Sequence, residues 1–269
     1  DTDLEGEGLA PTQPYPTKPP AFDEQGATVD DLVDFTPEIR QMAIDAVDGF
    51  RLGPLYTPLS LNGTIFRPSA GGGANWSGAA VDPETGILYV PSRNIHSVMR
   101  FRDPEPGEPS TLRYILSRGD ASFIEAGNSR RRPVMPQGLP LWKPPYSRMT
   151  AIDMNRGEHV WMRPLGNGDR YRNHPLLRDL DLPPLGGDDS RSGPLLTKTL
   201  LVHALTTGGT SNGPQLVAYD KSSGVVVASV DLPSGAVGTP MTYMVDGRQF
   251  IGLTVGGEIP QLIALALPQ

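Results

Sequence analysis

Residues 71–92, GGGANWSGAAVDPETGILYVPS, decide the fold of this 269-residue chain. Three glycines lead into Asn75 and Trp76, and an apolar strand follows that ends at Asp82. The Asp side chain can cap a tight turn, Gly86 supplies the position that favours a left-handed backbone, and an apolar strand returns. The stretch therefore predicts a β-hairpin, preceded by a glycine-rich approach to Asn75 and Trp76.

The same turn recurs later in the chain, which indicates repeated structural units. The segment MTAIDMNRGEHVWMRPL begins at Met149, and LVAYDKSSGVVVASVDL begins at Leu216. At one constant spacing, five positions are identical: Ala151 and Ala218, Asp153 and Asp220, Gly157 and Gly224, Val160 and Val227, Leu165 and Leu232. A strand–turn–strand unit at such a period is typical of β-propeller blades. We count two to three blades, fewer than the four or more that usually close a ring.

Composition narrows the class of protein. With 31 Gly and 29 Pro, the chain favours short strands joined by turns and loops. A net charge of −7 without a long Lys/Arg run argues against nucleic-acid binding. The absence of cysteine excludes disulfides and thiolate metal sites. No apolar run approaches the ~18 residues that a membrane span requires. The chain begins without Met or a signal-peptide pattern, so we expect a processed form or a piece of something longer.

Two regions are expected along the chain. Residues 1–53 are predicted to be a Pro-rich connecting segment followed by an amphipathic helix, with Thr36 as N-cap and Pro37 in the first turn. Its apolar residues recur at helical spacing: Ile39, Met42, Ala43, Ala46, Val47 and Phe50. Residues 54–269 are predicted to form the blades, from the strands ILYV, TLRYIL, RMTAID, LLVHAL, QLVAYD, VVVASV and FIGLTV. Two long loops are expected near residues 102–147 and 166–192.

These motifs together resemble the pyrroloquinoline quinone (PQQ)-dependent dehydrogenases, the quinoprotein alcohol and sugar dehydrogenases. The resemblance rests on residues 71–92, on AIDMNRGEHVW ending at Trp161, and on LPSGAVGTPMTYMVDGRQFIGLTVGG at residues 232–257. Residues 11–26, PTQPYPTKPPAFDEQG, are similar to the connecting stretch of membrane-type glucose dehydrogenases. The resemblance implies an all-β fold, the C-terminal part of an eight-bladed propeller. It also implies a tryptophan docking motif ending at Trp161, which Ala228 replaces in the later repeat.

The resemblance further implies PQQ on the propeller axis with Ca²⁺ beside it. The catalytic base and metal ligands of the family lie in earlier blades and have no counterpart here, since Lys198 precedes Thr-Leu and not Thr-Gly. We therefore expect no catalytic and no metal-ligating residue in this chain. Arg191 is a candidate because Arg binds carboxylates bidentately, and Asn94 because Pro91 stands where relatives often have Asn. The cofactor-binding candidates are Asn75, Trp76, Asn94, Arg191 and Gly257.

The expected function is oxidation of a sugar or alcohol in the periplasm, with hydride transfer to the quinone. The expected partners are the small-molecule substrate and the missing N-terminal blades. The alternative is a non-catalytic propeller module with a decayed quinone site, which Pro91, Ala228 and Glu258 favour. Asn75 as a turn cap and Trp76 as a core or inter-blade aromatic remain open. The four histidines share no metal-ligand spacing, and Asp188 and Asp189 are expected to be solvated in a loop.

Overall fold

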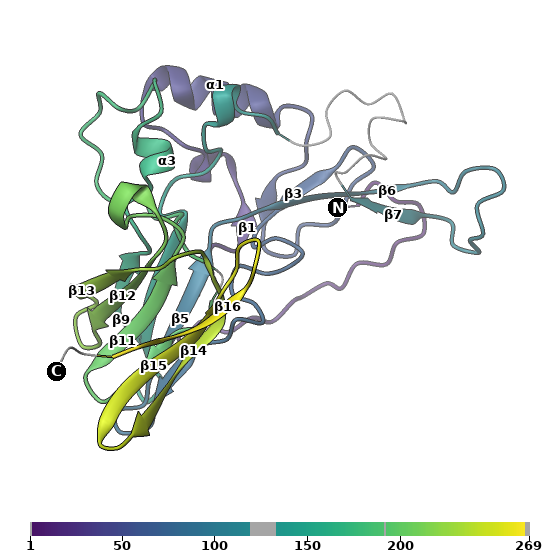
Figure 1. Cartoon of the computed structure of the whole chain (residues 1–269). Coiled ribbons are helices and arrows are strands. Elements are labelled where there is room, and N and C mark those ends of the chain that lie inside the picture. Colours follow the sequence, from purple (N-terminus) through teal and green to yellow (C-terminus); the bar gives the residue numbers. More distant parts are fainter. Residues whose placement is uncertain (1, 119–132, 191, 267–269) are drawn as a thin grey trace. The chain divides into compact units, whose positions relative to one another are not determined.

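The computed structural model describes residues 2–118, 133–190 and 192–266, which divide into two interleaved units (Figure 1). Unit 1 comprises Asp1–Tyr15, Asp23–Gly73 and Asn94–Lys143. Unit 2 comprises Pro16–Phe22, Ala74–Arg93 and Pro144–Gln269. The division of the chain after residue 53 stays a prediction.

The predicted helix lies in unit 1 as α1 (Pro37–Val47). The Thr36 hydroxyl accepts a hydrogen bond from the Ile39 amide at 3.2 Å, which satisfies one free N–H of the first turn. One face buries Ile39, Ala43 and Val47, as the apolar spacing predicts. Phe50 lies beyond the last helical residue.

The other described elements of unit 1 are short strands and 3₁₀ turns. Strand β1 (Gly26–Ala27) pairs with β2 (Gly53–Pro54), and 3₁₀ turns occupy Val29–Asp31 and Pro136–Gly138. A three-stranded antiparallel sheet has the order β3–β6–β7, formed by Thr64–Phe66, Ser97–Arg102 and Ile115–Arg118. Strand β7 covers only the end of the predicted strand TLRYIL.

Unit 2 contains three antiparallel sheets, each formed by strands in chain order. The first sheet holds β4 (Ala80–Asp82), β5 (Ile87–Arg93), β8 (Ser147–Asp153) and β9 (Glu158–Pro164). The second holds β10 (Leu195–Leu196), β11 (Leu200–Leu205), β12 (Gln215–Asp220) and β13 (Val226–Asp231). The third holds β14 (Ala236–Val245), β15 (Arg248–Val255) and β16 (Gln261–Leu265). The short helix α3 (Asp169–Arg172) and the 3₁₀ turn Thr210–Asn212 lie in connections.

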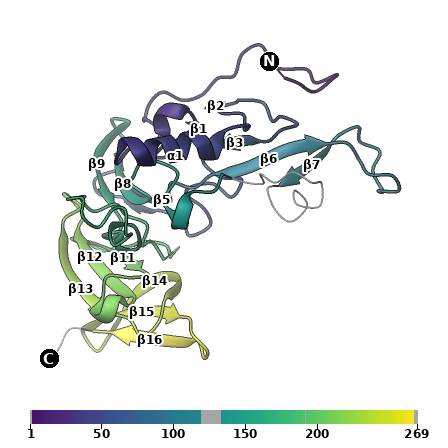
Figure 2. The ribbon, with the colours of Figure 1, turned by 90° about the horizontal axis from the view of Figure 1, so that it is seen from above.

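The second sheet is covered on both faces, which explains why LLVHAL is apolar without alternation. Leu201 and Leu205 of β11 join a core with Tyr89 and Met149 of the first sheet. The intervening Val202 and Ala204 join a second core with Leu253 and Val255 of the third sheet. Figure 2 shows β11–β13 beside β14–β16. Each sheet therefore packs face to face on the next, as blades do.

The sequence repeat that relates Ala151 to Ala218 is also a repeat of structure. The hairpins β8–β9 and β12–β13 both contain an irregularity directly after this shared alanine. In each turn the Asp carboxylate accepts two backbone N–H groups, and the glycine has positive φ, 66° for Gly157 and 69° for Gly224. At the first turn the Asp82 carboxylate accepts the Glu84 amide and the Thr85 hydroxyl, and Gly86 has a φ of 72°. The hairpin prediction is confirmed at all three turns.

Trp161 links the first sheet to the turn of the second. Its indole Nε1 donates to the Lys221 carbonyl at 3.1 Å, and its ring lies against Gly224, where an added Cβ would be 2.8 Å away. The Lys221 ammonium binds the Asp82 carboxylate at 2.6 Å. Trp161 therefore acts as the predicted docking residue, whereas Ala228, its exposed counterpart on β13, makes no such contact.

Candidate functional site

The first strands of the three sheets, β4, β10 and β14, are neighbours in unit 2. The loops before β4 and β10 meet at Gly193, where β14 also approaches. A side chain at Gly193 would overlap the Ser77 carbonyl before β4 and the Thr239 hydroxyl of β14. Only a glycine allows this approach, which brings the loop that carries Asn75 and Trp76 next to the segment that contains Asp188, Asp189 and Gly193.

Asn75 and Trp76 form the tip of the loop before β4. The Asn75 side-chain oxygen accepts the Trp76 amide at 2.8 Å, and its carbonyl accepts the Gly78 amide at 2.9 Å. Asn75 therefore stabilises the turn, as its simpler interpretation proposed. The Trp76 side chain is 100% exposed, so Trp76 is not part of the core of this chain, and the interpretation of Trp76 as an inter-blade aromatic stays open. A fully exposed indole presents a flat apolar surface to a ligand.

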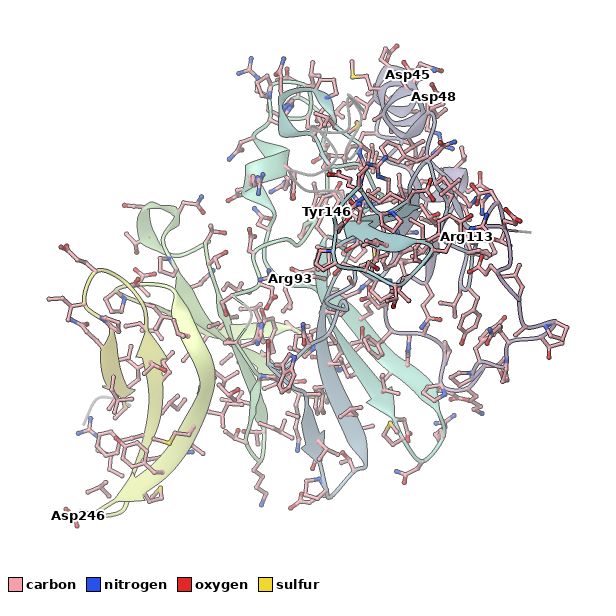
Figure 3. The ribbon with its side chains drawn as sticks, turned by 90° about the vertical axis from the view of Figure 1, so that its right-hand side faces the viewer. Asp45, Asp48, Arg93, Arg113, Tyr146 and Asp246 are labelled. Atoms are coloured by element: carbon pink, nitrogen blue, oxygen red, sulfur yellow. The ribbon has the colours of Figure 1, made fainter. Side chains whose placement is uncertain are left out.

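Asp189 is held by a buried network of charged and polar side chains. Its Oδ1 lies 2.7 Å from His203 Nε2, and its Oδ2 accepts from Arg93 Nε at 2.5 Å. The Arg93 guanidinium also donates to the Asp189 carbonyl. Arg93 ends β5 and lies well away from the β14–β15 turn at Asp246 (Figure 3). The network thus joins β5 of the first sheet, through Asp189, to β11 of the second sheet.

Electrostatics hold this aspartate in its charged form. Burial acts to raise the pKa of Asp189, but the hydrogen bond and charge of His203 and the charge of Arg93 outweigh burial. The pKa of Asp189 therefore lies below its usual value. His203 is fully buried, and because an ionised carboxylate only accepts, His203 Nε2 donates. Its Nδ1 has no hydrogen-bond partner among the residues that the structure describes.

Asp188 and Ser190, on either side of Asp189, are also held by hydrogen bonds. The Asp188 carboxylate accepts the Gly168 amide at 2.7 Å, and the Asp188 carbonyl accepts the Thr206 amide at 2.7 Å. The Ser190 hydroxyl donates to the Ala204 carbonyl at 2.8 Å. Both aspartates are buried, so the expectation that this pair is solvated was wrong. Hydrogen bonds therefore hold three consecutive residues in place, Asp188, Asp189 and Ser190.

The remaining candidates occupy different places. Arg191 lies outside the described residues. Gly257 follows β15 with a φ of 113°, and an added Cβ would be 3.4 Å from the Ser234 hydroxyl. Gly257 thus belongs to a turn of the third sheet, whereas Asn75 belongs to the loop before the first. The role of each candidate toward a cofactor stays a prediction.

Asn94 is part of a buried polar cluster in unit 1. Its side-chain oxygen accepts from Arg67 at 3.2 Å, and its side-chain nitrogen donates to the Lys143 carbonyl at 2.9 Å. Arg67 also pairs with Asp31 at 2.9 Å and stacks over Trp142. These contacts give the Asn94 amide a structural role, and Trp142 packs on Arg67 in the same cluster.

Within residues 2–118, 133–190 and 192–266, no group of three or more His, Asp or Glu side chains could hold a metal ion. The exposed Trp76 ring lies on a loop that Gly193 contacts, and it offers a flat apolar surface to a planar ligand. In the same part of the chain, no helix is long and apolar enough to cross a membrane.

The sequence did not reveal the Arg93–Asp189–His203 network. The available signal was weak: a histidine inside the apolar strand LLVHAL, and an acidic pair just before a strand. A buried histidine needs a polar partner, which makes a nearby carboxylate the natural candidate. Arg93 carried no comparable signal, because its partner lies 96 residues away.

One protein-family model and several curated proteins match most of this chain. A family model described as "PQQ: Glucose/ethanol/alcohol dehydrogenase, beta-propeller domain" matches residues 1–251. The chain is 27% identical over 271 residues to quinoprotein glucose dehydrogenase of Escherichia coli (strain K12), covering 94% of this chain and 32% of the relative. It is 28% identical over 295 residues to the glycerol dehydrogenase large subunit of Gluconobacter oxydans (strain 621H), covering 98% and 38%.

A solved structure is also similar. Quinohemoprotein alcohol dehydrogenase from Comamonas testosteroni matches 72% of this chain and 24% of its own, with 21% identity and a TM-score of 0.44. The chain spans about a third of the length of the curated relatives it matches.

Proposed function

The chain belongs to the β-propeller family of PQQ-dependent glucose, ethanol and alcohol dehydrogenases, and on this premise we propose that it is the C-terminal part of a periplasmic enzyme that oxidises a sugar or an alcohol. The match over residues 1–251 carries the proposal. The named relatives act on glucose and glycerol, which supports a polyhydroxylated or simple alcohol substrate. The periplasmic location rests on the resemblance alone.

In this proposal the loop with Asn75 and Trp76, together with the neighbouring segment that contains Asp189 and Gly193, holds the quinone. When bound, the quinone accepts the hydride that leaves the alcohol carbon. Trp76 offers its exposed ring to the planar cofactor, and Arg93 and His203 keep the neighbouring segment around Asp189 in place. Arg191 is the proposed partner of a quinone carboxylate. The base and the Ca²⁺ ligands are proposed to come from preceding sequence.

The free face of the third sheet supports the proposal that further blades pack there. One face of this sheet is buried against the second sheet. The other face stacks Tyr243 on Phe250, with ring centroids 5.4 Å apart, and exposes Met241 and Leu262. An open apolar sheet face of this kind is typical of a surface that another element covers. The N-terminal blades of the longer protein are the proposed occupant.

The test is quinone binding with and without the preceding sequence. PQQ and Ca²⁺ are added to this chain and to the longer gene product, and thermal shift, tryptophan fluorescence and dye-linked oxidation of glucose and simple alcohols are recorded. We expect turnover only from the longer protein. Trp76→Ala should weaken quinone binding, whereas Tyr15→Ala, at an exposed aromatic of unit 1, should not.

Three outcomes would contradict parts of this proposal. A longer protein that neither binds quinone nor reduces the dye would exclude the enzyme and favour the non-catalytic module. Turnover by this chain alone would show that the base lies within it. Unchanged quinone affinity in both Asn75→Ala and Trp76→Ala would remove that loop from the site.

A further inference from the structure

Strand β13 is the outer edge of the second sheet (Figure 2). All six of its residues are exposed. Four valines at this edge, Val225, Val226, Val227 and Val230, are each between 45% and 56% exposed. No charged residue lies between Val225 and Val230. Natural edge strands usually carry charges or prolines that prevent pairing with another chain.

The same molecule contains a protected version of this strand. Strand β9 is the equivalent of β13 one repeat earlier and forms the outer edge of the first sheet. Where β13 and the residue before it have Val225, Val226 and Val230, β9 has charged or polar residues. These counterparts are Glu158, His159 and Arg163.

A segment of the chain itself also lies against β9. Lys18 Nζ is 3.7 Å from Glu158 Oε1, and His159 Nε2 is 3.0 Å from the Pro20 carbonyl. The segment that supplies Lys18 and Pro20 belongs to the same unit as β9. The outer edge of the first sheet, β9, thus carries charged residues and contacts the segment with Lys18 and Pro20. The valines at β13, the outer edge of the second sheet, are exposed.

Backbone geometry does not account for this difference. Both hairpins have the same extra residue, Val160 in β9 and Val227 in β13, opposite the shared alanine. Such a bulge limits edge pairing equally in both strands. The two edges therefore differ in side chains and in cover, which points to different surroundings in the working protein.

We propose that β13 is a self-association strand, through which two copies of this chain pair in antiparallel fashion about a twofold axis. Antiparallel pairing is self-complementary, since each strand offers the other the same row of N–H and C=O groups. The valine run places no like charges opposite each other. Asp231 is the only charge in β13, and in an antiparallel pair the two copies of Asp231 lie at opposite ends.

The apolar side chains supply the driving force for this pairing. The valines of the two copies would lie side by side across the paired strands and cover part of their exposed area, which favours association in proportion to the apolar area covered. Pairing through β9 would instead require desolvation of Glu158 and Arg163. The inference concerns the outer edge alone and does not depend on quinone binding, so the two proposals fail independently.

The test is the mass of this chain in solution, measured by sedimentation velocity and light scattering over a wide range of concentration. We expect a reversible dimer. The test variant is Val225→Glu/Val226→His/Val230→Arg, which gives β13 the residues that β9 carries at the same positions. The added charges should raise the dimer dissociation constant by roughly tenfold or more. Circular dichroism and thermal unfolding check that the variant is folded.

A matched control separates β13 from the free face of the third sheet. Leu262→Lys places a charge on that face, at a residue 72% exposed, and should leave the dimer intact. A wild-type chain that is monomeric throughout, a dimer that persists in the folded β13 variant, or a dimer lost in Leu262→Lys alone would each overturn the proposal.

Hydrogen exchange on the unaltered chain gives a second measurement that needs no variant. Amides of β13 should exchange more slowly as protein concentration rises, because pairing protects them. Amides of β9 should not change with concentration. Exchange of β13 that is independent of concentration would contradict the proposal even if the variant failed to fold.

Discussion

Asp189 connects residues that are distant in the sequence through one buried carboxylate. Arg93 and His203 bind its two oxygens, and Arg93 also reaches its carbonyl. Breaking one partner of a buried charge pair costs more than the pair contributes, because the other charge is left without compensation. The network therefore makes the position of the segment around Asp189 sensitive to a single residue.

The first residue-scale prediction concerns acid. The folded pKa of Asp189 lies below its unfolded value, about 3.9. Its contribution to stability is therefore complete above the unfolded pKa and is lost as pH falls through the folded pKa. Asp189→Asn should lower the free energy of unfolding by about 3 kcal/mol at neutral pH. It should also flatten the dependence of that free energy on pH below about 4.

Urea unfolding at several pH values measures both effects. Asp179→Asn is the control, because that carboxylate is 87% exposed. A pH dependence in Asp189→Asn as steep as in the wild type would show that Asp189 does not titrate as the network implies.

The second residue-scale prediction concerns Gly193. Gly193→Ala should destabilise the protein by about 1–3 kcal/mol, because the methyl group would overlap the Ser77 carbonyl and the Thr239 hydroxyl. Gly235→Ala is the control, since an added Cβ there meets nothing within 4 Å. The midpoints of urea unfolding should differ between the two variants. Equal midpoints would mean that the loops before β4 and β10 do not meet at Gly193.

At the scale of elements, the hairpin turns were predictable and the contacts between sheets were only partly so. Spacing of Asp and Gly is a local signal, so the turns at Asp153 and Asp220 follow from the sequence. Helix α1 was predictable for the same reason, through Thr36 and the apolar spacing. The network around Asp189 was not, because its partners are brought together by packing of sheets and not by spacing.

The element-scale prediction tests the docking of one sheet on the next. Trp161→Ala should destabilise the protein by about 3 kcal/mol, the low end for a large aromatic, because the ring is half-buried. The variant loses the bond to the Lys221 carbonyl and the packing on Gly224. Val160→Ala, an exposed neighbour on the same strand, should change stability by no more than about 0.5 kcal/mol. Thermal unfolding of both variants gives the comparison, and a similar small effect in each would assign the docking to other residues.

At the scale of the whole molecule, the propeller-type all-β fold class and the family were predicted and are confirmed. The division into interleaved units was not foreseen. Between β5 and β8 the chain leaves unit 2 for residues 94–143 and then returns to the same sheet. The pairing of β5 with β8 was not predictable, because the two strands are separated by residues 94–143 and no local sequence signal links them.

The matching irregularity in the β8–β9 and β12–β13 hairpins has a consequence for how such a chain can change length. Because Ala151 and Ala218 hold equivalent places in two sheets, removing the stretch that separates them would join one strand to the second half of its equivalent without shifting the inward and outward alternation. A deletion of any other nearby length would turn side chains to the wrong face or displace the Asp–Gly turn. The chain is in this sense modular, and genetic gain or loss of a sheet is tolerated only in steps of one complete period.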